Sequence, residues 1–147
     1  NVASATSIKL NEFKAQEISN IAWAFAVTDA KHGDLLYKIA VAAEAKQIEF
    51  SSQGVSNLLW AFAPVSIANS EVFGRLVEKV LVAKRGLEPQ ELSNICWAHA
   101  RAWVHNRKLF HWTARTAHLS CSQLTTQHLS NITWAFSTLA VIDKPFF

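Results

Sequence analysis

The sequence predicts an all-α fold, an α-solenoid of stacked helix–turn–helix repeats, and three observations support this prediction. The segment QEISNIAWAFA at Gln16 returns as QGVSNLLWAFA at Gln53, QELSNICWAHA at Gln90 and QHLSNITWAFS at Gln127. The copies are 37 residues apart, and no insertion or deletion breaks the spacing. The chain contains only four glycines and three prolines, which favours long helices. A fixed period of this length is typical of arrays in which each unit covers its neighbour's apolar face.

The period makes residues 1–147 one helical-repeat array. Residues 1–12 match the end of a preceding repeat, residues 13–49, 50–86 and 87–123 are full repeats, and residues 124–147 form a truncated one. Because both ends fall inside the repeat pattern, we expect the chain to be an excerpt of a longer protein.

The first helix of each repeat is expected to begin near residues 15, 52, 89 and 126. Ser51 and Thr125 each offer a side-chain oxygen as an N-cap, whereas Lys14 has no acceptor to offer. Pro89 fits the first helical position, where its missing N–H has no consequence. Pro64 is expected to end or bend the second of these helices early.

A second helix follows in each repeat, and apolar residues at helical spacing predict its buried stripe. In the second repeat, Asn69-Ser70-Glu71 resembles a cap with an acidic first turn, and Gly86 is a favoured stop. The stripe comprises Val72, Phe73, Leu76, Val77, Val80 and Leu81, with equivalents Leu35, Leu36, Ile39, Ala40 and Ala43 before it and Leu109, Phe110, Thr113, Ala114 and Ala117 after it. Val2 and Ala3 fall at the end of an earlier second helix, and Phe146 and Phe147 at the beginning of a later one, after the cap-like Asp143-Lys144-Pro145.

A glutamine, an asparagine and a tryptophan mark every repeat and share one face of the first helix. These signature residues are Gln16, Asn20, Trp23, Gln53, Asn57, Trp60, Gln90, Asn94, Trp97, Gln127, Asn131 and Trp134. The tryptophan is either a base-stacking platform or a spacer between repeats. Its polar neighbours favour a spacer in the core, because a buried indole needs a partner for its N–H group. We also expect the asparagines to bond to neighbouring backbone.

The composition permits an anionic partner without requiring one. The net charge is +3 and the pI is about 9.0, which is mildly basic. No apolar run approaches the ~20 residues that span a membrane, so we expect no membrane span. Cys96 and Cys121 form no CxxC pair, and we expect reduced thiols.

Neither catalysis nor metal binding is expected. The chain contains no P-loop, no G-x-S-x-G and no acid pair at repeated helical spacing. Five histidines lie between His99 and His128, but their spacing fits neither HExxH nor a His/Cys finger. We therefore expect no metal site, no cofactor and no enzymatic activity.

Two sets of residues are candidates for contacting a nucleic acid. The basic residues of the third repeat and those just before it are candidate phosphate contacts, namely Lys84, Arg85, Arg101, Arg107, Lys108 and Arg115. Aromatic residues and histidines are interleaved with them, namely Trp103, His105, His111, Trp112 and His118. Variable positions near the first-helix starts are candidate base contacts, namely Lys14, Glu17, Ser51, Glu88, Glu91, Thr125 and His128. The alternatives are a solvated basic rim for the first set and ordinary variation of exposed positions for the second.

The boxes ISNIAWAFA, VSNLLWAFA, LSNICWAHA and LSNITWAFS, each preceded by F/L-x-x-Q, resemble the octotricopeptide repeat. They resemble its 37-residue relative, the heptatricopeptide repeat, still more closely. These repeats are related to those of FAST-kinase-like and RAP-domain proteins. The resemblance covers the chain from Phe13 onward, although His99 replaces a phenylalanine, Pro64 lies in a box's tail, and no RAP-type domain is present.

The resemblance implies an RNA-binding solenoid of a mitochondrion or plastid. Such proteins act in RNA processing, stability or translation, or bind ribosomal RNA within an organellar ribosome. The implied partners are single-stranded or ribosomal RNA together with ribosomal or RNA-processing proteins. A protein–protein scaffold with the same fold and no direct RNA contact is the alternative.

Overall fold

The computed structural model describes residues 2–28, 33–46, 49–65, 70–82 and 87–142, and within them the chain is all-α, with eight α-helices and no strand. The predicted all-α class is confirmed. The helices are α1 (Val2–Lys9), α2 (Ala15–Val27), α3 (Gly33–Ala45), α4 (Ser52–Phe62), α5 (Ser70–Val82), α6 (Pro89–Arg101), α7 (Arg107–Leu119) and α8 (Thr126–Thr138). Two short 3₁₀ turns, Ala63–Val65 and Cys121–Gln123, follow α4 and α7.

The first helices of the repeats, α2, α4, α6 and α8, begin at the residues that the sequence predicts. The Ser51 hydroxyl accepts a hydrogen bond from the Gly54 N–H at 3.1 Å, and the Thr125 hydroxyl accepts one from the His128 N–H at 3.3 Å. Pro89 is the first residue of α6. The helix α4 ends after 11 residues, where Pro64 enters a 3₁₀ turn, whereas α2, α6 and α8 have 13 residues each. These four predictions are confirmed.

The second helices, α3, α5 and α7, begin at Gly33, Ser70 and Arg107 and therefore keep the same spacing. Their predicted apolar stripes are buried, with only Leu81 partly exposed. The helix α1 has the place of an earlier second helix and packs against α3, as predicted, although Val2 itself is exposed.

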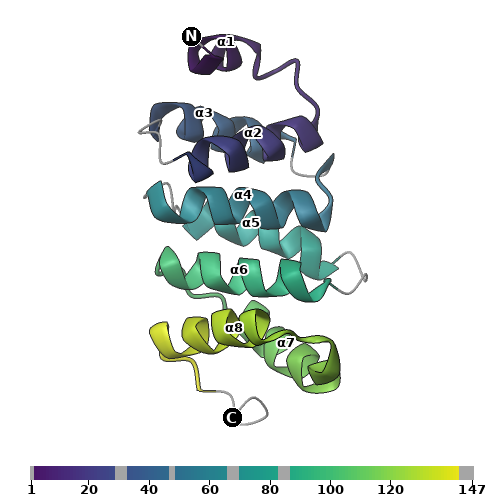
Figure 1. Ribbon diagram of the computed structural model, residues 1–147. Helices are drawn as coiled ribbons and strands as arrows, with labels where there is room; N and C mark the ends of the chain where they lie inside the picture. The colour runs from purple at the N-terminus through teal and green to yellow at the C-terminus, as the bar shows by residue number, and fades with distance from the viewer. Residues whose placement is uncertain (1, 29–32, 47–48, 66–69, 83–86, 143–147) are drawn as a thin grey trace.

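The helices follow one another in chain order from one end of the molecule to the other, with α1 at one end and α7 and α8 at the opposite end (Figure 1). The helix α2 packs against α4, α4 against α6, and α6 against α8. The second helices α3, α5 and α7 pack against α2, α4 and α6, respectively. Phe62, Phe73, Phe110 and Phe136 are fully buried within the core that joins these helices.

Polar contacts between second helices recur at equivalent positions. The Lys38 Nζ donates to the Ser7 hydroxyl at 2.7 Å, and Arg75 forms an ion pair with Glu44 at 2.5 Å. Both members of the second pair lie one period after those of the first. Such exposed pairs contribute little stability.

Several predicted features lie outside the described residues. They are Lys84, Arg85, the stop at Gly86, the cap at Asn69, and the start of a further helix at residues 143–147.

Candidate nucleic-acid interface

The tryptophans of the repeat signature form a ladder that runs across successive first helices. The ring centroids of Trp60 and Trp97 are 6.0 Å apart with planes inclined by 26°, and those of Trp97 and Trp134 are 6.2 Å apart with planes inclined by 30°. Each of these indoles therefore faces the indole of a neighbouring repeat, which is the contact expected of a spacer and leaves little ring face for a base.

Core placement, which the sequence led us to expect for all four indoles, is wrong for two of them. Trp23 is 48% exposed and Trp134 is 41% exposed, while Trp60 and Trp97 are partly buried. The reason is geometric, because an indole between two first helices is covered from both sides. Trp23 and Trp134 lie on the outermost first helices of the described chain, where only one side is covered.

Two hydrogen bonds made by polar side chains of the repeat boxes lie within a single helix. The Ser19 hydroxyl donates to the Gln16 carbonyl at 2.9 Å, and the Gln90 side-chain amide donates to the Asn94 Oδ1 at 2.8 Å. Among the described residues, no hydrogen bond joins a signature asparagine to neighbouring backbone, so that expectation is wrong for this part of the chain. The backbone groups of an adjacent helix are already paired with each other, which leaves few acceptors for the asparagines.

A polar cavity of about 350 Å³ lies where α2 meets α4. Its lining residues are Gln16, Ser19, Asn20, Glu49, Phe50, Ser51, Gln53, Gly54 and Asn57. A Cβ atom at Gly54 would lie 3.2 Å from the Phe50 ring and 3.6 Å from the Ser19 hydroxyl, so the glycine permits this close approach.

The candidate base contacts gather at the first-helix starts, where most of them act as caps. The Glu17 carboxylate accepts from the Lys14 N–H at 2.8 Å, and the Glu91 carboxylate accepts from the Glu88 N–H at 3.0 Å. Thr125 and His128 cap each other, because the Thr125 N–H donates to the His128 Nδ1 at 3.3 Å. With the Ser51 cap described above, five of these seven side chains serve the helix starts, whereas Lys14 and Glu88 take part only through their backbone N–H groups.

Two of these starts are also linked to neighbouring repeats. The Ser52 hydroxyl donates to the Glu91 carboxylate at 3.2 Å, which joins α4 to α6. The His128 Nε2 lies 3.2 Å from the Gln90 Oε1, which joins α8 to α6, and His128 is only 8% exposed. Base contact by these residues stays a prediction, and their existing bonds favour the structural alternative.

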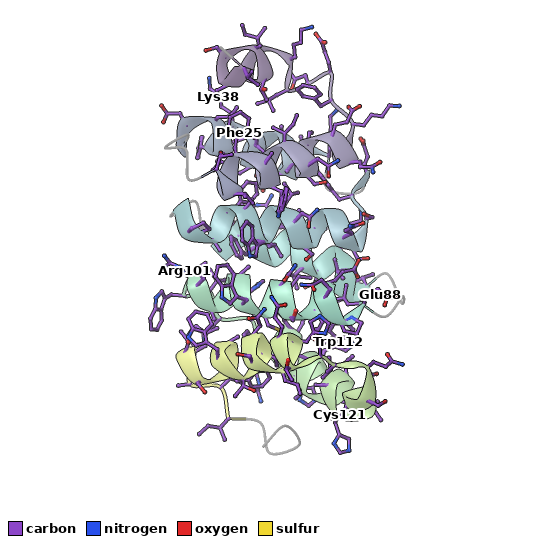
Figure 2. All side chains as sticks on the ribbon, viewed as in Figure 1. Phe25, Lys38, Glu88, Arg101, Trp112 and Cys121 are labelled. Carbon is purple, nitrogen blue, oxygen red and sulfur yellow. The ribbon has the colours of Figure 1, made fainter. Side chains whose placement is uncertain are left out.

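The candidate phosphate contacts lie at the other end of α6. Arg101 is the last residue of α6, and Arg107 and Lys108 are the first residues of α7, so a five-residue loop brings them together. Figure 2 shows Glu88 and Arg101 at opposite edges of the stack. All three cations are exposed, and the Lys108 ammonium is 3.2 Å from the Glu78 carboxylate. Arg115 is exposed about two turns further along α7.

The charge along this part of the chain is one-sided. Residues 92–142 contain four arginine or lysine residues and five histidines, with no aspartate or glutamate. The low net charge of the whole chain hides this asymmetry, which a repeat-by-repeat count of charges would have revealed. A surface of one sign attracts and orients an oppositely charged polymer.

The loop after α6 is a helix stop that sequence reasoning missed. The Trp103 backbone is left-handed, with a φ of 56°. Its N–H donates to the Ala100 carbonyl at 3.1 Å, and the Val104 N–H donates to the His99 carbonyl at 2.9 Å, which together form a Schellman motif. The equivalent Ala140 after α8 has a φ of 51° and the same two bonds. A stop of this kind is normally signalled by a glycine, and neither position has one.

A second cavity, of about 300 Å³, opens beside this loop. It is lined by His105, Asn106, Arg107, Phe110, His111, Val141 and Ile142. Its wall thus combines a cation and two imidazoles with apolar side chains.

The interior of α6 holds two polar groups that burial makes inert. His99 lies edge-on to Phe73 at 5.2 Å, its Nδ1 is 2.9 Å from the Ile95 carbonyl, and its buried Nε2 has no partner among the described residues. Burial lowers the pKa of His99 to about 4, against the effect of the Ile95 carbonyl. Burial likewise raises the pKa of Cys96 to about 12, although a contact with Thr113 opposes this. A thiol that stays protonated is a poor nucleophile.

The described residues contain no group of three or more histidine, cysteine, aspartate or glutamate side chains that could hold a metal ion. In the same part of the chain, no helix has the length and apolar character needed to cross a membrane.

Comparison with known proteins gives one family. No curated protein matches the chain. The model of the RNA-editing substrate-binding complex 6 protein family matches residues 1–146. Because this match spans nearly the whole sequence, the chain belongs to the RNA-editing substrate-binding complex 6 protein family.

Proposed function

We propose that this chain is an RNA-binding helical-repeat component of an RNA-editing substrate-binding complex. The single observation that carries the proposal is the family match over residues 1–146, because the family is named for a complex that binds editing substrates. The one-sided charge of residues 92–142 supports direct contact with RNA by this chain. The family and the resemblance of the repeats to organellar RNA-binding proteins both agree with a role in RNA processing in a mitochondrion.

The architecture that we propose is an α-solenoid of 37-residue repeats. Three kinds of observation support it, each found at equivalent positions: the helix starts, the contacts of Lys38 and Arg75 with the preceding second helix, and the Schellman stops at Trp103 and Ala140. An array of this kind presents a long surface, which suits an extended single strand.

The proposed mechanism of binding is phosphate contact by cations at the exit of α6, aided by stacking on nearby aromatic rings. Arg101 and Arg107 have no side-chain hydrogen bond or ion pair among the described residues, so their guanidinium groups are available to phosphate oxygens. Lys108 would exchange its exposed ion pair with Glu78 for a phosphate at little cost. No catalytic step is proposed for this chain.

Binding to a labelled 20-nucleotide oligouridine at 50 and 200 mM salt tests the proposal. We expect wild-type affinity to fall steeply with salt, and we expect replacement of Arg101, Arg107 and Lys108 by glutamine to reduce the logarithmic slope by about 2. The charge-matched control replaces Lys9, Lys38 and Arg75, which are exposed on earlier repeats, and should keep most of the slope.

The scaffold alternative expects no salt-dependent RNA retention by the wild-type chain, and that result would overturn the proposal. If the two triple variants showed equal salt dependence of RNA affinity, the exit of α6 would not be the binding site. The total charge, and not its position, would then determine binding.

A further inference from the structure

The side chain of Trp103 is the most exposed indole of the described residues, at 70% exposure. From its position and conformation we infer that Trp103 is a base-stacking residue for single-stranded RNA. This inference rests on the proposed function and adds to it a named contact with a nucleobase. Aromatic side chains on basic surfaces stack on bases of any sequence, because every base has a π-face.

The backbone conformation of Trp103 indicates that its indole is not there for stability. A left-handed φ of 56° crowds the Cβ of any residue other than glycine and is therefore unfavourable for tryptophan. Packing does not offset this cost, because most of the indole is exposed. The equivalent stop after α8 uses Ala140, so the repeat itself does not require a large side chain. Strained residues of this kind cluster at binding sites.

The loop holds the backbone of Trp103 in a fixed place. Two backbone hydrogen bonds close the stop, and Val104 anchors it in the core with only 7% of its surface exposed. Because the backbone is already ordered, stacking a base on the ring needs to fix only the rotamer of the side chain.

The surroundings of Trp103 favour a nucleic acid over a protein. Arg101 lies two residues before Trp103 and His105 two residues after it. His105 and Arg107 both line the neighbouring cavity. No acidic residue occurs between residues 92 and 142, so the site would repel cationic segments and attract phosphates. We therefore place one base on the indole and its adjoining phosphates on Arg101 and Arg107.

The ladder tryptophans are poorer candidates for this role. The rings of Trp60 and Trp97 face each other, and Trp97 also faces Trp134, so their faces are already occupied. Trp112 is partly buried against the core. Trp103 is thus the indole whose face is most open to a base.

Replacement of Trp103 by glycine tests the inference without endangering the fold. Glycine accepts a positive φ, so the variant should unfold at the wild-type temperature or up to about 4 °C above it. Its affinity for the labelled oligouridine should fall roughly 5- to 150-fold, the usual loss for one stacked base. The matched control Ala140→Gly relieves the same conformation in the next repeat and should leave the affinity unchanged.

Two further measurements define the contact as stacking. Trp103→Phe keeps an aromatic ring and should bind within about threefold of wild type. On a ribose-phosphate oligomer that lacks bases, wild type and Trp103→Gly should bind equally. A similar loss on both oligomers would contradict stacking, and so would equal oligouridine affinity for wild type and Trp103→Gly.

These outcomes are separable from the proposed function. If wild type shows no salt-dependent RNA binding, the proposed function fails, and this inference fails with it. If wild type binds with the expected salt dependence and Trp103→Gly binds equally well, only the stacking role is overturned. Loss of a protein contact without loss of RNA affinity would assign Trp103 to a protein interface instead.

Discussion

The two ends of α6 use their side chains in opposite ways. At the start, the Glu91 carboxylate accepts from the Glu88 N–H and from the Ser52 hydroxyl, and Gln90 contacts both Asn94 and His128. At the exit, Arg101 and Trp103 are exposed and have no side-chain hydrogen bond among the described residues. The comparison teaches that side chains at the start hold repeats together, whereas those at the exit are free to meet a ligand.

The backbone at the two ends differs in the same sense. Pro89 begins α6 in a conformation that a proline prefers, so the start carries no strain. The exit places a tryptophan in a conformation that glycine prefers. The backbone conformation is therefore favourable for its residue at the start of α6 and unfavourable for its residue at the exit.

The largest effect concerns His99, whose carbonyl anchors the exit and whose ring lies in the core. Its pKa is about 4 when folded, against 6.5 for an ordinary histidine, so protons bind preferentially to the unfolded chain as the pH falls. The contribution of neutral His99 to the free energy of unfolding is fully present above pH 6.5. It is lost progressively between pH 6.5 and 4, by about 3 kcal/mol in total. Urea unfolding of wild type and His99→Phe at pH 7, 6 and 5 measures it.

The His99→Phe variant restores the residue type of Phe25, Phe62 and Phe136 at this position and should lose most of the pH dependence. The exposed His105, changed to glutamine, is the control and should retain the wild-type dependence. Parallel curves for wild type and His99→Phe would show that other groups titrate on unfolding.

The next effect concerns the middle of α6, between the two ends. Trp97 stacks on two neighbours and is partly buried, so Trp97→Ala should lower the free energy of unfolding by about 2–3 kcal/mol, less than for a fully buried indole. Replacement of Leu119, which is 80% exposed, by alanine should lower the free energy of unfolding by less than about 0.5 kcal/mol. A loss as small for Trp97 as for Leu119 would mean that the ladder does not hold the repeats together. Urea unfolding gives both values.

A smaller effect is expected at the start of α6. Glu91→Ala removes the acceptor for the Glu88 N–H and for the Ser52 hydroxyl, which should cost about 1 kcal/mol. Because the start is far from the exit, RNA affinity measured with the same oligouridine should not fall. Glu91→Gln, which keeps an acceptor oxygen, should recover part of the stability. A marked loss of RNA affinity in either variant would show that the residues at the helix starts contact RNA after all.

The smallest effect is a gain at the start of α2. Lys14 occupies the N-cap without accepting a hydrogen bond, whereas the equivalent Ser51 does accept one. Lys14→Ser should therefore raise the free energy of unfolding by about 0.5–1 kcal/mol, as measured by urea unfolding, with Lys9→Ser as the control. A weaker affinity for RNA in Lys14→Ser, beyond that of Lys9→Ser, would support the candidate base contact at this position.

The helices, their starts and their buried stripes could all be predicted from the sequence alone. Each of these depends on residues three or four apart, such as Ser51 and Gly54 or Phe73 and Val77, and the repeat supplies several copies of the same local pattern. The basic character around Arg101 and Arg107 was also legible in the sequence. The absence of acidic residues over positions 92–142 was equally legible there.

Which polar residues already have partners, and which indoles are covered, could be seen only in the folded molecule. The Ser52–Glu91 and Gln90–His128 contacts join different repeats, so no local pattern announces them. The exposure of Trp23 and Trp134 depends on how many neighbouring helices lie beside them, and the left-handed turn at Trp103 is seen only in the folded backbone. Burial and pairing are properties of what surrounds a side chain, and those surroundings exist only once the repeats are packed together.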